Sequence, residues 1–326
     1  MNPLKEEFSL LSSVAVLDGK SSLLTNRYAI QWILSRRGQY AFLSTLSGQA
    51  ITRFTLIAIS GVRIPLPPLP EQKAIAEVLE CWDNAIQKYE EKIEKKKNIK
   101  KGLMQRLLTG EQRLPGFDGE WKEVKFRTLF DITSSKRVFR SEWKTKGIPF
   151  YRAREIVRLS EKDTIRNELF ISNDMYEKFR EKYGVPQYDD LLVTGVGTIG
   201  KVYRVKDMRK FYFKDGNILW FRSKQIASSK YIEQAFRTRI IRRQILGKSP
   251  ITTVATYTIV AANSTIILLP PLPEQKAIAS VLSAADAEIS ALEKKVVILR
   301  DQKKFLLNNL VTGTIRLPEF CGGEAG

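Results

Sequence analysis

Three glycines spaced as in nucleotide-binding loops are the feature of this sequence that most suggests chemistry. Gly195, Gly197 and Gly200 follow the strand-like text DDLLVT and satisfy the pattern GxGxxG, which in a dinucleotide-binding turn leads into a helix. The text after Lys201 reads VYRVKD, which is typical of a strand, so no helix N-terminus is available to bind a pyrophosphate. Val202 stands where a GxxxxGK[ST] loop needs a hydroxyl group for magnesium. We therefore expect a glycine-rich turn that joins two strands.

Other residue types that perform catalysis are absent or wrongly spaced. The sequence contains no histidine, and Cys81 and Cys321 are far apart, which excludes a His/Cys zinc cluster, a Ser-His-Asp triad and a disulfide framework. Glu120 and Lys122 form ExK without an aspartate at nuclease spacing. The Pro-Pro pairs at 67–68 and 270–271 precede leucine, whereas the motif of amino-methyltransferases ends in an aromatic residue. We expect no catalytic site, no metal and no cofactor in this chain.

Composition and charge indicate a globular protein with a polyanionic partner. The 326 residues are 43% apolar and 27% charged, which suits two or more domains with real cores. The net charge is +19, and residues 111–265 hold most of it, with 31 Lys and Arg against 18 Asp and Glu. No apolar stretch reaches the roughly 18 residues that span a bilayer, and the N-terminus lacks the order of a secretory signal. We expect a cytoplasmic location.

A long internal repeat organises the chain. PPLPEQKAIA at residues 67–76 recurs unchanged at 270–279, and LLTGEQRLPGF at 107–117 matches LVTGTIRLPEF at 310–320. Over residues 67–117, 26 of 51 positions are identical to those 203 residues later, which indicates a duplication. Weaker matches in the same register, such as Tyr28 with Tyr231 and Thr55 with Thr258, place the start of each copy farther upstream.

Each copy predicts a helix of about 40 residues with one narrow apolar stripe. Glu71 and Glu274 suit the first turn, and Gly110 and Gly313 suit the C-terminal end. Such a helix needs a partner, and the other copy is the obvious one; separate packing of each helix on its own domain is the alternative. The predicted helix–helix interface comprises Ile75, Leu79, Trp82, Ile86, Tyr89, Ile93, Leu103, Leu107, Ile278, Leu282, Ala285, Ile289, Leu292, Val296, Leu299, Leu306 and Leu310.

Four segments follow from the repeat. Residues 67–117 and 266–326 are the two helical regions, residues 118–265 form a complete mixed α/β domain, and residues 1–66 match only the distal part of such a domain. Within the complete domain we expect strands at 121–132, 190–194, 201–205, 211–213 and 217–221, and helices at 173–183 and 229–246.

Basic residues of the central domain cluster with aromatic and small polar residues at 134–144, 150–154 and 236–248. Lysine and arginine in such segments contact phosphates, and arginine, asparagine or glutamine can contact base edges. The candidate DNA-binding residues are Lys136, Arg137, Arg140, Arg152, Arg154, Thr198, Lys201, Lys214, Arg242, Arg243 and Lys248. In contrast, the lysine run at 95–101 lies in a helix of almost balanced charge and predicts a solvated face.

PPLPEQKAIA, followed by a long helix and RLPGF-like text and present twice, resembles the conserved regions of the DNA-specificity (S) subunits of type I restriction–modification systems. EWKEVKF, GIPFYRAREI, DDLLVTGVGTIGKVYRV and DGNILWF resemble one of their target-recognition domains in the family's usual order. The resemblance implies an α+β fold in which a globular mixed α/β target-recognition domain accompanies two conserved helices packed as an antiparallel coiled coil. It makes residues 1–66 the distal part of a first target-recognition domain.

The resemblance implies a non-catalytic reader of double-stranded DNA. Its partners are methyltransferase (M) subunits, which carry S-adenosylmethionine, and restriction (R) subunits, which use ATP and Mg²⁺. A second S chain is a possible further partner because residues 1–66 match only part of a recognition domain. The alternative is a helical scaffold or half-subunit that assembles partners without reading a full bipartite site.

Overall fold

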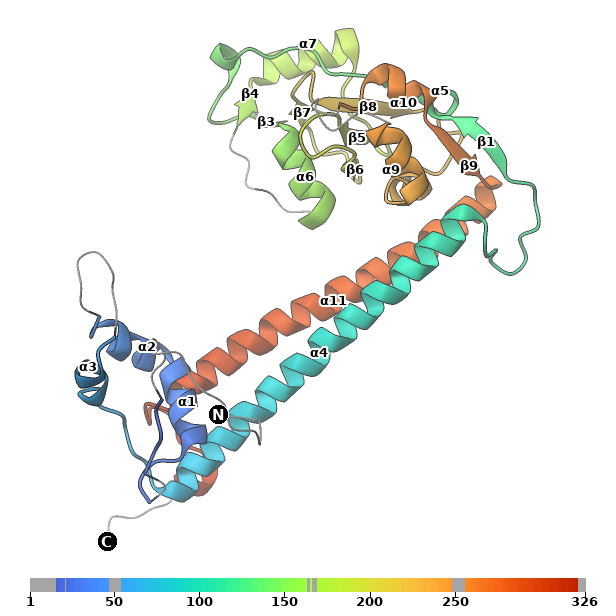
Figure 1. The fold of residues 1–326 in the computed structure, drawn as a ribbon. Coiled ribbons are helices and arrows are strands. Elements are labelled where there is room, and N and C mark those ends of the chain that lie inside the picture. The colour runs from blue at the N-terminus through green and yellow to red at the C-terminus, as the bar shows by residue number, and fades with distance from the viewer. Residues whose placement is uncertain are drawn as a thin grey trace. The chain divides into compact units, whose positions relative to one another are not determined.

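The computed structural model describes residues 16–20, 22–46, 54–162, 165, 169–247 and 256–321. The chain divides into two compact units (Figure 1). We call residues 97–287 the central unit, and residues 1–96 together with 288–326 the terminal unit. Each is described by itself.

Two sheets and a strand pair form the framework of the central unit. The four-stranded sheet has the order β2-β8-β5-β6 and is antiparallel throughout. Its strands are β2 (Phe130–Thr133), β5 (Leu191–Thr194), β6 (Val202–Arg204) and β8 (Ile218–Ser223). The three-stranded sheet has the order β4-β3-β7 and consists of β3 (Ile148–Tyr151), β4 (Phe170–Ile171) and β7 (Tyr212–Phe213). β1 (Lys122–Lys125) pairs separately with β9 (Ile266–Leu269).

Both faces of the four-stranded sheet are buried, because alternate side chains of its strands belong to two different cores. Leu191 and Val193 of β5 join one core, with side chains of α8 (Ser229–Ala235), α9 (Arg239–Leu246) and α10 (Ile259–Ser264). Leu192, between them, joins a second core with α6 (Ala153–Lys162). Successive side chains of a strand point to opposite faces, so a sheet covered on both sides reads as the continuous apolar run LLV rather than as an alternating pattern.

The structure corrects three of the predicted elements. The expected strand at 121–132 is interrupted by α5 (Phe126–Leu129), which turns the chain between β1 and β2. The expected helix at 229–246 is two helices, because the Thr238 hydroxyl accepts a hydrogen bond from the backbone N–H of Ile241 and caps α9. The region from residue 266 begins with β9 rather than with a helix. The helix expected at 173–183 is α7 (Asn173–Tyr183), whereas α6 was not predicted.

The terminal unit contains α1 (Asn26–Leu34), α2 (Arg36–Leu43), α3 (Leu56–Ser60) and parts of the two long helices. Tyr28 and Trp32 of α1 pack in one core with Ile75 and Leu79 of α4 (Leu69–Thr109) and with Leu310 of α11 (Leu272–Leu310). A short helix with two adjacent large aromatics on one face is thereby anchored to the long ones, since a helix of nine residues has little stability alone.

The two long helices contain 41 and 39 residues, close to the predicted length, and they pack antiparallel. Within the terminal unit, Lys96 pairs with Glu288 at 2.8 Å, and Asp83 pairs with Lys303 at 2.6 Å, so residue numbers rise along one helix as they fall along the other. Between these pairs Ile86, Ile93, Ile289, Val296 and Leu299 form an apolar seam. No helix among the described residues is both long enough and apolar enough to cross a membrane.

The repeat of the sequence is also a repeat of structure. The N-caps of α1, α2 and α3 are Thr25, Ser35 and Thr55, and those of α8, α9 and α10 lie 203 residues later at Ser228, Thr238 and Thr258. One glutamine in each copy joins its helix triplet to its long helix. Gln72 accepts from the Thr25 backbone N–H, and Gln275 accepts from that of Ser228, both at 2.9 Å. The match at 1–66 therefore extends to three helices, their caps and their attachment.

Candidate nucleic-acid interface

The glycine-rich segment is a rigid turn between β5 and β6. Buried Thr194 holds it, because the Thr194 hydroxyl donates to the carbonyl of Thr198 and accepts from the backbone N–H of Lys201 at 3.0 Å. Gly197 and Gly200 both have φ of +75°, which favours glycine over other residues. The turn therefore presents Thr198 and Lys201 on a fixed backbone without a helix N-terminus behind it.

Helix α9 is the most basic element beside this turn. Its Ile241 and Ile245 are buried, and Arg242 and Arg243 occupy the exposed face. The Gln244 side chain donates to the carbonyl of Ile266 at 2.8 Å and accepts from its backbone N–H at 2.7 Å. These bonds to β9 fix the rotation of the helix, so the two arginines point outward together.

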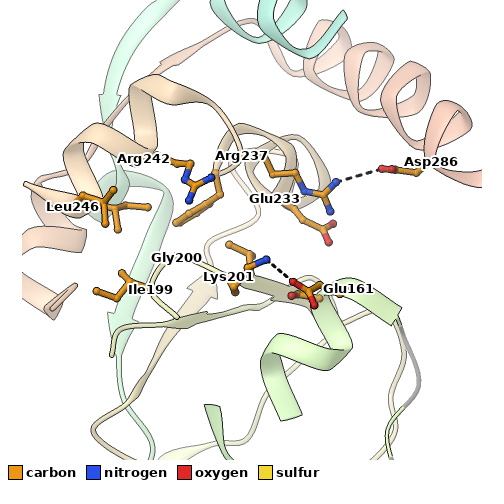
Figure 2. A pocket seen from close by; sticks show the side chains of 13 residues that line it. Glu161, Ile199, Gly200, Lys201, Glu233, Arg237, Arg242, Leu246 and Asp286 are labelled. Atoms are coloured by element: carbon orange, nitrogen blue, oxygen red, sulfur yellow. Dashed lines mark hydrogen bonds and ion pairs between the residues drawn. The ribbon is translucent and has the colours of Figure 1, made fainter. Parts of the chain in front are cut away.

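The turn and α9 enclose a cavity of about 410 Å³. A Cβ atom on Gly200 would lie 3.3 Å from the Ile245 side chain, which shows how closely the two elements approach. Figure 2 shows Arg242 reaching toward this cavity from α9 and Lys201 from the turn. Thr198 belongs to the turn but is not among the cavity-lining residues.

Acidic side chains neutralise some of the cavity cations but not all. Lys201 lies 2.5 Å from Glu161, and Arg237 lies 3.7 Å from Asp286 (Figure 2). Among the described residues, neither Arg242 nor Arg243 has a carboxylate partner. An exposed guanidinium without an internal counter-ion is best placed to exchange solvent counter-ions for phosphate.

A second group of candidate residues surrounds Asp215. Arg137 and Lys214 both pair with this carboxylate at 3.2 Å. Burial alone would raise the pKa of Asp215, but the hydrogen bonds from these two cations hold its pKa below the ordinary value. Lys136 lies nearby with its ammonium 4.7 Å from the centre of the Tyr183 ring. This group is therefore partly neutralised within the protein.

Arg152 and Arg154 flank a buried carboxylate at the start of α6. Glu155 accepts from the Arg152 side chain at 2.9 and 3.0 Å and from Arg154 Nε at 2.6 Å. Burial would raise the pKa of Glu155, and these hydrogen bonds outweigh it and lower the pKa. Both arginines are therefore paired within the protein, and Arg152 ties the residue that follows β3 to the first turn of α6.

The structure thus sorts the predicted DNA-binding residues into different environments. Lys201 and Arg242 line one cavity, Arg243 lies on the same helix as Arg242, and Arg140 is exposed in the short 3₁₀ segment Arg140–Glu142. Lys248 lies outside the described residues. Sequence reasoning missed the cavity residues Glu161, Glu233, Arg237 and Asp286, of which Arg237 fell within a basic segment, although nothing in the text showed which way it faced. No group of three or more cysteine, aspartate or glutamate side chains in the described part of the chain could hold a metal ion.

The predicted helix–helix interface residues are all buried or half-buried. In the terminal unit Trp82, Tyr89 and Leu292 pack against the seam described above, whereas Ile75, Leu79, Leu306 and Leu310 belong to the core around Tyr28 and Trp32. In the central unit Leu103, Leu107, Ile278 and Leu282 merge into the main core. Lys100, from the lysine run of α4, is buried in this part of the central unit and bonded to Asp286, and burial lowers its pKa.

Comparison with known proteins gives one consistent family. The family model of the type I restriction modification DNA specificity domain matches residues 1–98 and 118–299. The type I restriction enzyme MjaVIII specificity subunit of Methanocaldococcus jannaschii is 27% identical over 325 residues, covering 94% of this chain and 74% of the relative. A protein of Haemophilus influenzae named as a type I restriction enzyme specificity subunit is 23% identical over 297 residues, covering 90% and 72%.

Two solved structures share the fold. The S subunit of a type I restriction–modification system from M. genitalium has a TM-score of 0.56 at 15% identity, covering 88% of this chain and 73% of that one. The HsdS subunit of Thermoanaerobacter tengcongensis has a TM-score of 0.50 at 17% identity, covering 90% and 71%.

Proposed function

The chain belongs to the family of type I restriction–modification DNA specificity domains, and from this premise we propose that its central unit reads the sequence of duplex DNA. The observation that carries the proposal is the pair Arg242 and Arg243, which α9 holds on its exposed face and which have no carboxylate partner in the described part of the chain. The glycine turn beside them adds Lys201 and Thr198 on a fixed backbone. Together they offer cations for phosphates and forked donors for base edges.

We propose further that the long helices dock methyltransferase and restriction subunits and that the chain itself catalyses nothing. The outer faces of these helices are rich in charge of both signs, which suits recognition of a protein partner more than tracking of a phosphate backbone. S-adenosylmethionine, ATP and Mg²⁺ would then act in those partner subunits, in the cytoplasm.

Selection from a random duplex library tests DNA reading directly. The full chain, co-purified with its methyltransferase subunit, is incubated with the library at fixed salt, and bound duplexes are sequenced. We expect enrichment of a defined motif, and loss of that enrichment in Arg242→Gln/Arg243→Gln. Arg209→Gln, which removes a charge already paired with Asp207 at 2.8 Å, is the matched control and should retain the motif.

The same experiment distinguishes the scaffold function. Co-purification with the methyltransferase subunit but equal affinity for all duplexes would contradict DNA reading and leave subunit assembly as the role of the chain. The pairs that hold the two long helices together, such as Lys96 with Glu288, are consistent with either outcome. The selection therefore decides between the two functions.

A further inference from the structure

In the central unit, Trp121 packs at the start of helix α11, against the carboxylate of Glu274. Its indole Nε1 donates to Glu274 Oε2 at 3.0 Å, and the Arg113 guanidinium lies 5.4 Å from the centre of the Trp121 ring. Arg113 itself donates to both oxygens of Glu274, at 2.5 and 2.7 Å. The fully buried Glu274 carboxylate therefore has three donors, which is what a buried charge requires.

The segment that carries this tryptophan is held by strand pairing as well. Directly after Trp121, strand β1 runs antiparallel to β9, with Lys122 opposite Leu269 and Val124 opposite Ile267. Just before it, a Cβ atom on Gly119 would lie 2.7 Å from Pro271. The pattern Gly-x-Trp-Lys-x-Val thus fits this site through a close backbone approach, an indole hydrogen bond and a strand edge.

The terminal unit has the same two receiving residues in the register of the repeat: Glu71 lies 203 positions before Glu274, and Arg316 lies 203 positions after Arg113. Arg316 donates to both oxygens of Glu71, at 2.9 and 2.7 Å, as Arg113 does to Glu274. No indole completes this carboxylate among the described residues. A cavity of about 290 Å³ lies there instead, lined by Tyr28, Pro68, Glu71, Gly313, Arg316 and neighbouring residues.

Two matched glycines show where the indole is missing. A Cβ atom on Gly110 in the central unit would lie 3.4 Å from the Trp121 ring. On its counterpart Gly313, the same atom would meet nothing within 4 Å in the described part of the chain. The two glycines have similar φ, +77° and +72°. Both units therefore have the glycine backbone conformation against which the ring packs, but among the described residues only the central unit has the ring.

The counterpart of β9 is also left without a pairing partner in the described part of the chain. In the described residues, segment 63–66 lies in a connection without assigned strand structure and makes no backbone hydrogen bond to a strand, and Leu66 is 52% exposed. Just before β9, the Thr265 carbonyl accepts from the Phe126 backbone N–H, so by alternation the backbone groups of residues 267 and 269 also face β1. Leu268 faces the other way and bonds Tyr231. Pro65, its counterpart, therefore removes no donor from the open edge.

We propose that this surface of the terminal unit binds a strand of the type Gly-x-Trp-Lys-x-Val from a second polypeptide. All five tryptophans of the sequence are placed elsewhere: Trp32 and Trp82 in the terminal unit, and Trp121, Trp143 and Trp220 in the central unit. The occupant adds a strand to segment 63–66, donates its indole N–H to Glu71 and places its ring under Arg316. This inference does not depend on DNA reading.

A labelled peptide with the sequence of residues 118–127, DGEWKEVKFR, provides the test on the full chain. Fluorescence anisotropy should show saturable binding, and a peptide with Trp121→Ala should bind more than about tenfold more weakly. In the protein, Leu66→Pro removes the N–H that the added strand needs and should abolish binding. Leu66→Ala, which keeps that N–H, is the matched control and should retain it.

Three results would overturn the proposal. They are the absence of saturable peptide binding, equal binding of the alanine peptide, and equal binding to Leu66→Pro. Sedimentation of the free protein gives an independent check. A stable homodimer that excludes the peptide would mean that a second copy of this chain, rather than another polypeptide, covers the surface. Thermal unfolding confirms that each variant is folded before binding is measured.

Discussion

Replacing Arg242 and Arg243 by glutamine should make DNA binding less sensitive to salt. Both side chains are exposed and lie on the outer face of α9, opposite the buried Ile241 and Ile245. The substitution removes two positive charges without removing a described ion pair. We therefore expect the free energy of unfolding to stay within about 0.5 kcal/mol of the original value, so that any change in binding reports on the DNA contact.

The size of the effect follows from counter-ion release. Each phosphate contact contributes about 0.9 to the slope of log K against log salt concentration on duplex DNA. Loss of two contacts should reduce the magnitude of the slope by about 1.8. The ratio of the original protein's affinity to the variant's should therefore be about tenfold larger at 50 mM salt than at 200 mM. Titration of a labelled duplex at four salt concentrations measures the slope.

The control for this titration is Arg209→Gln. Arg209 is exposed like the other two arginines, but its guanidinium already lies on Asp207 at 2.8 Å, so its removal should change the slope by less than about 0.5. If the double variant and the control gave the same slope, Arg242 and Arg243 would not contact phosphate. The assignment of α9 to the DNA interface would then be wrong.

Three further substitutions test the packing and the electrostatics of the central unit. Lys100→Met should raise the free energy of unfolding by about 1 kcal/mol, because burial lowers the pKa of Lys100 and disfavours its charge, while Asp286 keeps its contacts with Arg237 and Gln234; an unchanged or lower free energy of unfolding would show that the bond between Lys100 and Asp286 outweighs burial. Gly200→Ala should cost about 1–2 kcal/mol in urea unfolding, since its φ is +75° and α9 is close, and Gly197→Ala, with open space around it, should cost less. Glu155→Gln should lower the free energy of unfolding at pH 7. Because the folded-state pKa of Glu155 is lowered, the difference in stability between the two proteins should shrink as the pH falls below about 4.3, the ordinary pKa of a glutamate, and through the lower folded-state pKa; unfolding curves at pH 7 and pH 3 measure it.

The sequence predicted best those parts of the fold that depend on long periodic patterns. An apolar stripe that persists for about eleven helical turns cannot be satisfied by a strand or by a short helix, so both long helices were recognised. The unchanged repetition of PPLPEQKAIA at their starts, and Gly110 and Gly313 at their ends, left little freedom in the boundaries. Helix 173–183 was equally clear because Ser172 caps it and Gly184, with φ of +81°, ends it.

Short elements and the shape of the site were predicted less well. α5 is only four residues long and lies between two strands, so its apolar residues Phe126 and Leu129 read as part of a longer strand. α6 has the polar sequence AREIVRLSEK. Its Arg154 and the preceding Arg152 were predicted to bind DNA, whereas the structure shows both paired with Glu155. The cavity joins residues more than 120 positions apart, from Ser160 to Asp286, and no local pattern reports such a distance.

The internal repeat separates residues that maintain the fold from residues that act on a partner. The helix α9 and its counterpart α2 share an N-cap hydroxyl, from Thr238 and Ser35, and both begin with an arginine. Arg242 and Arg243, however, correspond to Gln39 and Tyr40. The cap is needed wherever this helix forms, so it was kept in both copies, whereas the two exposed charges contribute nothing to packing and occur in one copy only. The scaffold does not need these charges, and they occur only in the unit that holds most of the positive charge, so they are best explained by what that unit binds.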